Sequence, residues 1–316
     1  MKGGLFHKRE LTIEQQQIRS AGKHKKDWKR LLLPYLLILP TFAFLALFAY
    51  YPIGNLIYLS FRKYNMISVD KYVGLRNYNQ LLNVSTDFKA ALRNTAVFTF
   101  VSMILIVVVS LLLGLSLQKD RRMNSVAKRA MFFPHIVSGV SISMIFAWLL
   151  NAQSGLFNQL LQMVGLPALK WLDSSQTALP SVIGINVWKA VGYYTLIILA
   201  ALGGIPAEIN EAAELDNTPA WRKFVRITFP MLSPQLFFML VNITIGSFKV
   251  FDLVRLLTNG GPGTATYVLV LYIYRYAFEW SLQIGYACAA GVVLMAILLV
   301  MTVIYFKLLE KRVHYQ

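Results

Sequence analysis

The chain has 316 residues, of which 57% are hydrophobic and only 14% are charged, and its mean hydropathy is +0.54. An ordinary soluble domain carries about 25% charged residues, so this composition excludes a water-soluble globule of this length. The 31 Lys and Arg residues outnumber the 14 Asp and Glu residues, which gives a net charge of +17. Because most of this charge lies in short segments between long apolar blocks, it indicates membrane topology rather than binding to nucleic acid.

Six long apolar blocks run along the chain, and about 20 apolar residues are enough for a helix to cross a membrane. The first, second, third and sixth blocks contain no charged residue. The fourth block contains Lys189, and the fifth contains Lys249, Asp252 and Arg255. A segment within lipid must satisfy its own backbone hydrogen bonds, so each block is predicted to be a helix. The predicted fold is an all-α integral membrane protein with six transmembrane helices, at residues 31–51, 95–117, 130–150, 179–202, 236–257 and 284–306.

The segments between the spans predict the orientation of the chain, because Lys and Arg are retained on the cytoplasmic side. With a cytoplasmic N-terminus, the inner segments hold 20 of the 31 Lys and Arg residues and the outer segments hold nine. This excess predicts that both termini are cytoplasmic (N-in, C-in). The first apolar block is too long for the core of a cleavable signal, so the segment before it is expected to anchor the topology. The expected domains are a basic cytoplasmic arm (1–30), a six-helix transmembrane domain (31–306) and a cytoplasmic tail (307–316).

Polar residues inside the fourth and fifth spans predict a solute pathway, because charges at membrane depth usually face a cavity or a partner. Aromatic rings offer flat surfaces to sugar rings, and amides, hydroxyls and ammonium groups reach sugar hydroxyls, so this mixture suits a carbohydrate-like solute. On a continuous helix Lys249 and Asp252 share one face and are expected to pair. The alternative is that the lysines snorkel to an interface and that the rings form an aromatic belt. The candidate pathway residues are Trp188, Lys189, Tyr193, Asn242, Ser247 and Lys249.

The sequence contains no pattern that indicates catalysis or a metal site. The glycine-rich run at 260–263 lacks the lysine of a phosphate-binding loop, and neither HExxH nor GxSxG occurs. Cys288 is the only cysteine, so it is expected to be a small packing residue. His135, beside Pro134, is expected to cap or pack. The energy for uphill transport must therefore come from a partner or from an ion gradient.

The segment between the fourth and fifth spans, residues 205–234, is predicted to form a helix, a turn and a second helix. Asp216–Asn217 is a turn signal, because Asn tolerates the left-handed conformation. Pro219 is expected to start the second helix, which is predicted to end before Pro230. Apolar side chains on this helix, ringed by basic ones, suit docking in a groove of another protein. A helix that lies flat on the inner leaflet would use the same basic residues.

This segment resembles the EAA motif of the membrane subunits of binding-protein-dependent ABC importers, whose pattern is approximately EAAxxDGAxxxxxFxxIxxPxxxP. Residues 73–78 (VGLRNY) resemble the family's GLxNY segment and residues 258–263 (TNGGPG) its TxGGP loop, which point to the MalF/UgpA-like branch. Asn217 stands where the family has glycine, and we expect the turn geometry to survive because Asn adopts the left-handed conformation at modest cost. The matching residues are Glu211, Ala212, Ala213, Asp216, Phe224, Ile227, Pro230 and Pro234.

The resemblance implies the permease subunit of an ATP-driven importer of an oligosaccharide or a related solute, such as a sugar phosphate or glycerol phosphate. It implies a second, homologous permease subunit, a cytoplasmic ATPase dimer that uses ATP and Mg²⁺, and an extracytoplasmic solute-binding protein or lipoprotein. The EAA loop of the family couples the ATPase to the permease. This chain is expected to bind no cofactor and no nucleic acid, to contact membrane lipid, and to lie in a bacterial cell membrane.

Two other functions stay open at this point. An ion-coupled secondary sugar transporter would work through Lys189, Lys249 and Asp252 without an ATPase. A membrane enzyme acting on lipid-linked sugars is disfavoured, because the sequence offers no acid–base cluster. Lysines in the pathway favour an acidic solute, but permeases for neutral sugars that resemble this one also carry lysines, so both substrate classes stay open.

Overall fold

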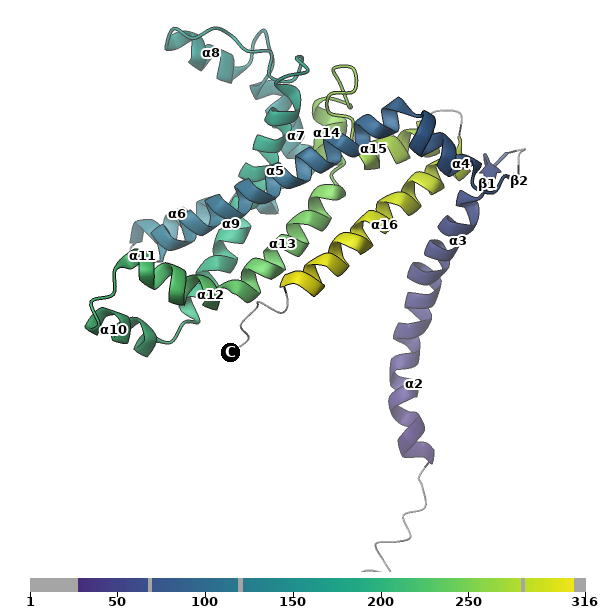
Figure 1. Ribbon diagram of the computed structural model, residues 1–316. Helices are drawn as coiled ribbons and strands as arrows, with labels where there is room; N and C mark the ends of the chain where they lie inside the picture. Colours follow the sequence, from purple (N-terminus) through teal and green to yellow (C-terminus); the bar gives the residue numbers. More distant parts are fainter. Residues whose placement is uncertain (1–27, 68–69, 119–121, 280–281, 310–316) are drawn as a thin grey trace, which may run out of the picture. The chain divides into compact units, whose positions relative to one another are not determined.

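The structure is a computed structural model whose described residues are 28–67, 70–118, 122–279 and 282–309 (Figure 1). Most of the predicted arm (1–30) and tail (307–316) lies outside the described residues. Within the described ranges the regular structure is helical, apart from one short hairpin of two strands. The chain divides into two compact parts, Met1–Asn55 and Leu56–Gln316.

The described residues of the first part lie in one long helix that extends past Asn55: α2 (Trp28–Leu45) continues through a π-helical turn, η1 (Ala46–Tyr50), into α3 (Tyr51–Ser60). The helix passes the predicted end of the first span because residues 52–60 carry no charge. Its apolar segment Leu33–Ser60 has 28 residues, and no residue in the most apolar stretch of 18 residues is buried. A helix of this length with exposed apolar side chains is suited to lipid.

The four long helices of the second part are α5 (Thr86–Leu117), α9 (Ala178–Gly203), α13 (Ser233–Phe248) and α16 (Ile284–Leu309). α9 packs on α5, and α13 packs on both α5 and α16 (Figure 1). Small residues allow the close crossings: a Cβ atom added to Gly114 of α5 would come within 2.5 Å of Cγ2 of Ile198 on α9. Close approach through small residues is typical of helix packing in membranes.

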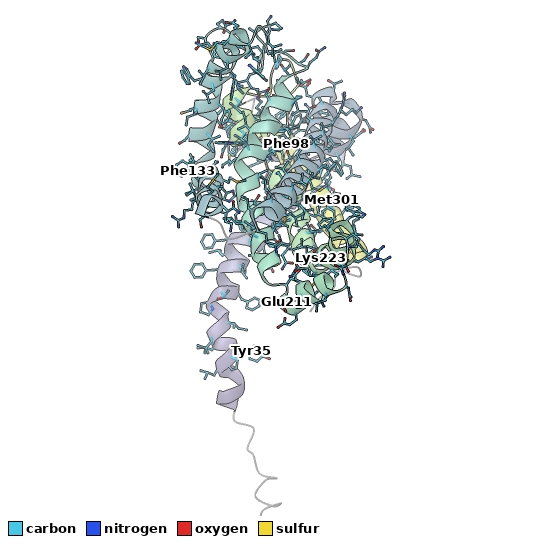
Figure 2. All side chains as sticks on the ribbon, turned by 90° about the vertical axis from the view of Figure 1, so that its left-hand side faces the viewer. Tyr35, Phe98, Phe133, Glu211, Lys223 and Met301 are labelled. Atoms are coloured by element: carbon cyan, nitrogen blue, oxygen red, sulfur yellow. The ribbon has the colours of Figure 1, made fainter. Side chains whose placement is uncertain are left out.

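The core of the second part lies where these helices meet. Phe98 and Ile198 are both 0% exposed, and Figure 2 shows Phe98 inside the bundle. The buried Ser110 hydroxyl donates to the carbonyl of Val191, which joins α5 to α9 at 3.2 Å. Cys288 is buried in a small apolar cluster, which confirms its predicted packing role.

The third predicted span is a broken helix. It divides into α6 (Arg122–Ile136) and α7 (Gly139–Leu149), which meet at an angle of 100°. The Ser138 hydroxyl accepts a hydrogen bond from the N–H of Val140 and so caps α7. The described residues therefore contain four helices long and apolar enough to cross a membrane, or six if each bent pair is one span. The helical membrane fold is confirmed, while the count of six and the orientation stay predictions.

The fifth predicted span ends early. α13 stops at Phe248, Lys249 forms its C-terminal cap, and the chain resumes a helix only at α14 (Asp252–Leu257). Between them Phe251 has φ −138°, which is outside the helical region. The prediction that Lys249 and Asp252 pair on one helical face is wrong, because the break separates them. No ion pair joins these two residues in the part of the chain that the structure describes.

The segment after α3 forms β1 (Arg62–Tyr64), β2 (Asp70–Tyr72), α4 (Arg76–Asn79) and η2 (Gln80–Val84). The two strands pair antiparallel. The GLxNY-like residues fasten this segment to the end of α3, because the Asn77 amide donates to the carbonyls of Ser60 (2.8 Å) and Arg62 (3.0 Å). Gly74 has φ +57°, a conformation that glycine adopts without a Cβ penalty. Gly74 and Asn77 therefore have a structural role, because they shape this segment and attach it to α3.

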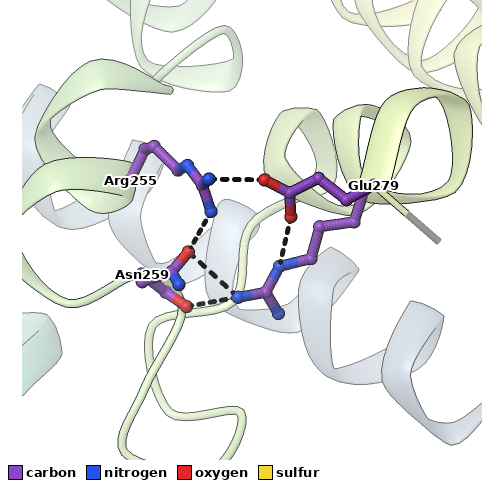
Figure 3. A network of polar contacts seen from close by, with 4 residues as sticks. Arg255, Asn259 and Glu279 are labelled. Carbon is purple, nitrogen blue, oxygen red and sulfur yellow. Dashed lines mark hydrogen bonds and ion pairs between the residues drawn. The ribbon is translucent and has the colours of Figure 1, made fainter.

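The remaining helices are α8 (Leu156–Met163), α10 (Ala207–Leu215), α11 (Ala220–Lys223), η3 (Phe224–Thr228), α12 (Phe229–Met231), α15 (Leu269–Tyr274) and η4 (Arg275–Glu279). A polar cluster ties α14 to η4 (Figure 3). Arg255 pairs with Glu279 and donates to the Asn259 side chain, and Arg275 donates to the Asn259 carbonyl at 2.7 Å and pairs with Glu279 at 3.7 Å. Burial raises the pKa of the neighbouring Tyr267 to about 12.

Candidate functional site

The 205–234 hairpin, made by α10 and the helix that follows it, turns at Asn217. The N–H of Thr218 donates to the carbonyl of Ala213, and the N–H of Asn217 donates to the carbonyl of Glu214, both at 3.0 Å. This pair of hydrogen bonds is the Schellman motif, which needs a left-handed residue just after the helix. Asn217 is that residue, with φ +46°. The structure thus confirms the expected left-handed turn without the family's glycine.

The second helix of the hairpin does not end before Pro230, which corrects the sequence prediction. α11, η3 and α12 run without interruption past this proline. A proline ring normally clashes with the preceding turn, but here that turn is a wider π turn, closed by a bond from the N–H of Phe229 to the carbonyl of Phe224. The chain bends by 65° at Leu232 instead, and α13 begins with Pro234 in its first turn.

The tip of the hairpin presents apolar side chains to its surroundings. Leu215 is 83% exposed and Trp221 is 75% exposed. Figure 2 shows Glu211 and Lys223 at the same end of the bundle. Exposed apolar groups rimmed by charge mark an interaction site. Among the motif residues, Ala213 is buried, Phe224, Ile227 and Pro230 are half-buried, and the exposed ones are Glu211, Ala212, Asp216 and Asn217.

Contacts within the hairpin hold its two helices as one unit. Lys223 forms an ion pair with Glu214 across the turn at 3.4 Å. The Phe224 ring lies between the rings of Trp221 and Phe229, at centroid distances of 6.1 and 6.0 Å. A largely apolar groove of about 860 Å³ lies between the Trp221 and Phe224 rings and the C-terminal part of α5.

A cleft of about 190 Å³, which we call the polar cleft because polar side chains gather in it, lies between α9 and α13, and Ile106 and Ile243 form apolar parts of its wall. α9 contributes Asn186, Lys189 and Ala190, and α13 contributes Asn242 and Ser247. Three predicted pathway residues, Lys189, Asn242 and Ser247, therefore meet in one cleft. Its amide, hydroxyl and ammonium groups are able to bond the hydroxyls or charged groups of a polar solute.

The other three predicted pathway residues lie elsewhere. Trp188 is half-exposed and lines a separate cleft of about 520 Å³, where its ring packs on Phe146 at 5.2 Å. Tyr193 stacks on His135 with ring centroids 4.4 Å apart and borders the polar cleft through that ring. Lys249 is exposed at the end of α13. Neighbours in sequence diverge because successive side chains on a helix point about 100° apart.

Three residues with polar side chains that line the cleft were not among the predicted pathway residues: His135, Asn186 and Tyr194. Asn186 lies on the same face of α9 as Lys189 and Tyr193, at spacings of three and seven residues. This helical spacing is the sequence signal by which Asn186 could have been predicted as a cleft residue. His135 comes from α6, close to the break in the third span, and no local pattern places it beside α9. Only the packing of α6 on α9 does so.

Apolar helices around a polar cleft, with an exposed helical hairpin at one end, define the membrane subunit of a transporter. The family described as binding-protein-dependent transport system inner membrane component matches residues 106–315. This chain belongs to that family.

Named relatives cover nearly the whole chain. The chain is 34% identical over 281 residues to the probable ABC transporter permease protein YurN of Bacillus subtilis (strain 168), covering 87% of this chain and 95% of the relative. It is 32% identical over 286 residues to the sn-glycerol-3-phosphate transport system permease protein UgpA of Brucella abortus biovar 1 (strain 9-941), covering 90% and 97%. Its fold matches a chain in the crystal structure of a bacterial alginate ABC transporter in complex with an alginate pentasaccharide-bound periplasmic protein, with a TM-score of 0.78, 26% identity, and coverage of 90% and 96%. The chain is an inner-membrane ABC transporter permease.

Proposed function

We propose that this chain is the permease subunit of an ATP-driven importer that carries an oligosaccharide or a related solute, such as a phosphorylated polyol, across the membrane. The observation that carries this proposal is the exposed 205–234 hairpin, which joins α9 to α13, the two helices that line the polar cleft. UgpA, which is named for sn-glycerol-3-phosphate, and the alginate transporter support the solute class. ATP and Mg²⁺ bind to partner ATPase subunits, and this chain supplies the pathway.

The hairpin docks in a cleft of the ATPase subunit and transmits its motion. The Schellman turn and the Glu214–Lys223 ion pair hold its two helices together, so a push on the hairpin moves both. Trp221 and Leu215 are the apolar anchors at its tip, and buried aromatic anchors usually supply most of the energy of a protein interface. Because only residues 204–206 separate α10 of the hairpin from α9 and only the bend at Leu232 separates the hairpin from α13, its displacement changes the cleft between α9 and α13.

The solute enters from an extracytoplasmic binding protein and passes the polar cleft. Lys189 offers an ammonium group, Asn186 and Asn242 offer amides, and Ser247 offers a hydroxyl, all from helices that move with the hairpin. A second permease subunit of similar fold completes the pathway on the side where the cleft is open.

Reversal of the charge at Glu211 tests this function. Glu211 is exposed on α10, so Glu211→Arg is expected to leave the protein folded and inserted. ATP-driven uptake of glycerol 3-phosphate and of alginate oligosaccharides by the reconstituted complex is expected to fall at least about thirtyfold, the effect of losing an interface contact of about 2 kcal/mol.

The matched control is Asp173→Arg, the same reversal at an exposed carboxylate outside the hairpin. This variant is expected to transport like the wild type. Normal uptake by Glu211→Arg, or an equal loss in Asp173→Arg, would contradict the proposed docking of the hairpin.

A further inference from the structure

The breaks in the third and fifth predicted spans meet at one point of the fold. Gly139 is the first residue of α7, Asp252 is the first residue of α14, and these two helices pack on each other. A Cβ atom added to Gly139 would lie 3.4 Å from Oδ2 of Asp252 and 3.8 Å from Nζ of Lys189. Two opposite charges, from α14 and α9, therefore converge on the same glycine.

Neither charge forms an ion pair in the part of the chain that the structure describes. A charge at membrane depth is costly unless it faces an opposite charge or a wet cavity. Lys189 does both, because it lines the polar cleft on one side and approaches Asp252 on the other. It is the residue at which the cleft and the two helix breaks meet.

We propose that Lys189 and Asp252 form an electrostatic latch, held over Gly139, that keeps the pathway closed in the resting transporter. This proposal rests on the proposed transport function. α6 and α7 flank one break, α13 and α14 flank the other, and discontinuous helices of this kind typically form the solute site around which a transporter's helix bundles move. When α9 separates from the α7–α14 contact, the attraction between Lys189 and Asp252 is lost. The Lys189 ammonium group is then free to bind the solute.

The geometry of the latch suits repeated opening. The two charges approach one glycine without a tight ion pair, so their attraction is weaker than that of a contact pair and their separation costs less. Gly139 has no side chain to fill the point where the charges converge. A leucine at this position would occupy that point and push the two groups apart.

A double-mutant cycle on the complete transporter in proteoliposomes tests the latch. The measured quantity is ATP hydrolysis without the binding protein, which a closed pathway keeps low. Lys189→Met and Asp252→Asn are each expected to raise this rate about fivefold, a modest coupling effect. The double variant is expected to raise it no further, and the charge swap Lys189→Asp with Asp252→Lys is expected to return it toward the wild-type rate.

Two other lysines serve as comparisons. Lys249→Met also removes a positive charge, at the break between α13 and α14 where Asp252 lies. Its effect on ATP hydrolysis is expected to be additive with that of Asp252→Asn. Lys170→Met, at an exposed position away from the cleft, is expected to leave the rate unchanged. Additive effects of Lys189→Met and Asp252→Asn, or a charge swap no closer to wild type than the single variants, would overturn the latch.

A cross-linking experiment keeps the proposal testable if a charge variant fails to assemble. In a Cys288→Ser background, Lys189→Cys and Asp252→Cys are expected to be joined by a short bifunctional thiol reagent in the resting complex. The yield is expected to fall after trapping with ATP and vanadate. No cross-link in the resting complex, or an equal yield in the trapped one, overturns the latch. Failure of the proposed function is a separate result, in which the wild-type complex couples no ATP hydrolysis to uptake.

Discussion

Asn217 turns the 205–234 hairpin in a conformation that most residues avoid. Its φ of +46° lies in the left-handed region, which costs roughly 1–2 kcal/mol for an ordinary side chain and less for Asn. The two hydrogen bonds of the Schellman motif hold the turn. Asn is therefore compatible with a turn that the family pattern fills with glycine.

Two substitutions at this residue separate backbone conformation from side-chain contact. Asn217→Gly is expected to preserve ATP-driven uptake, because glycine adopts a positive φ freely. Asn217→Val is expected to destabilise the hairpin by about 2 kcal/mol and to lower uptake, because a β-branched residue is strained there. Uptake in proteoliposomes measures both, with Thr218→Val, the next residue along, as control. Equal losses in the glycine and valine variants would show that the conformation of the turn is not what matters.

At the scale of the element, the segment between α14 and α16 is held by a charged cluster as well as by apolar packing, since Leu269 and Leu271 are fully buried in the core. The Glu279 carboxylate lies between the guanidinium groups of Arg255 and Arg275, and Asn259 accepts hydrogen bonds from both (Figure 3). These arginine and glutamate side chains are only 16–30% exposed, so solvent screens the cluster only in part.

Glu279→Gln is expected to loosen this segment. The substitution keeps the shape but leaves two guanidinium groups without their carboxylate, which costs about 1.5 kcal/mol. Local opening is then expected to rise about tenfold, and trypsin is expected to cleave after Arg255 and Arg275 correspondingly faster. Asp173→Asn, at an exposed carboxylate elsewhere, is the control. Unchanged cleavage at both arginines would mean that the cluster does not restrain the segment.

At the scale of the whole molecule, the source of energy separates the proposed importer from an ion-coupled transporter. Uptake into proteoliposomes is expected to stop when the ATPase subunits are omitted, because this chain supplies only the pathway. It is expected to survive a protonophore as long as ATP is supplied. The opposite pattern, uptake without ATPase subunits that collapses with the protonophore, would select the ion-coupled alternative.

The sequence by itself determined the class of the molecule. The length of an apolar block, the absence of charge within it and the spacing of turn residues are local properties, so the helical membrane fold and the turned hairpin followed without a structure. The left-handed Asn217 belongs to this group, since a turn depends on neighbours in sequence.

Only the tertiary structure decided which polar residues meet. Helix breaks and helix crossings depend on packing between segments far apart in sequence, so a pattern read along one helix misassigns partners across them. Asp252 therefore lies beside Gly139 together with Lys189, and it forms no ion pair with Lys249 in the described residues. His135 lines the polar cleft, whereas Trp188 lines a separate one. The local sequence determines the secondary structure of each segment, and the packing of segments determines which residues its polar side chains contact.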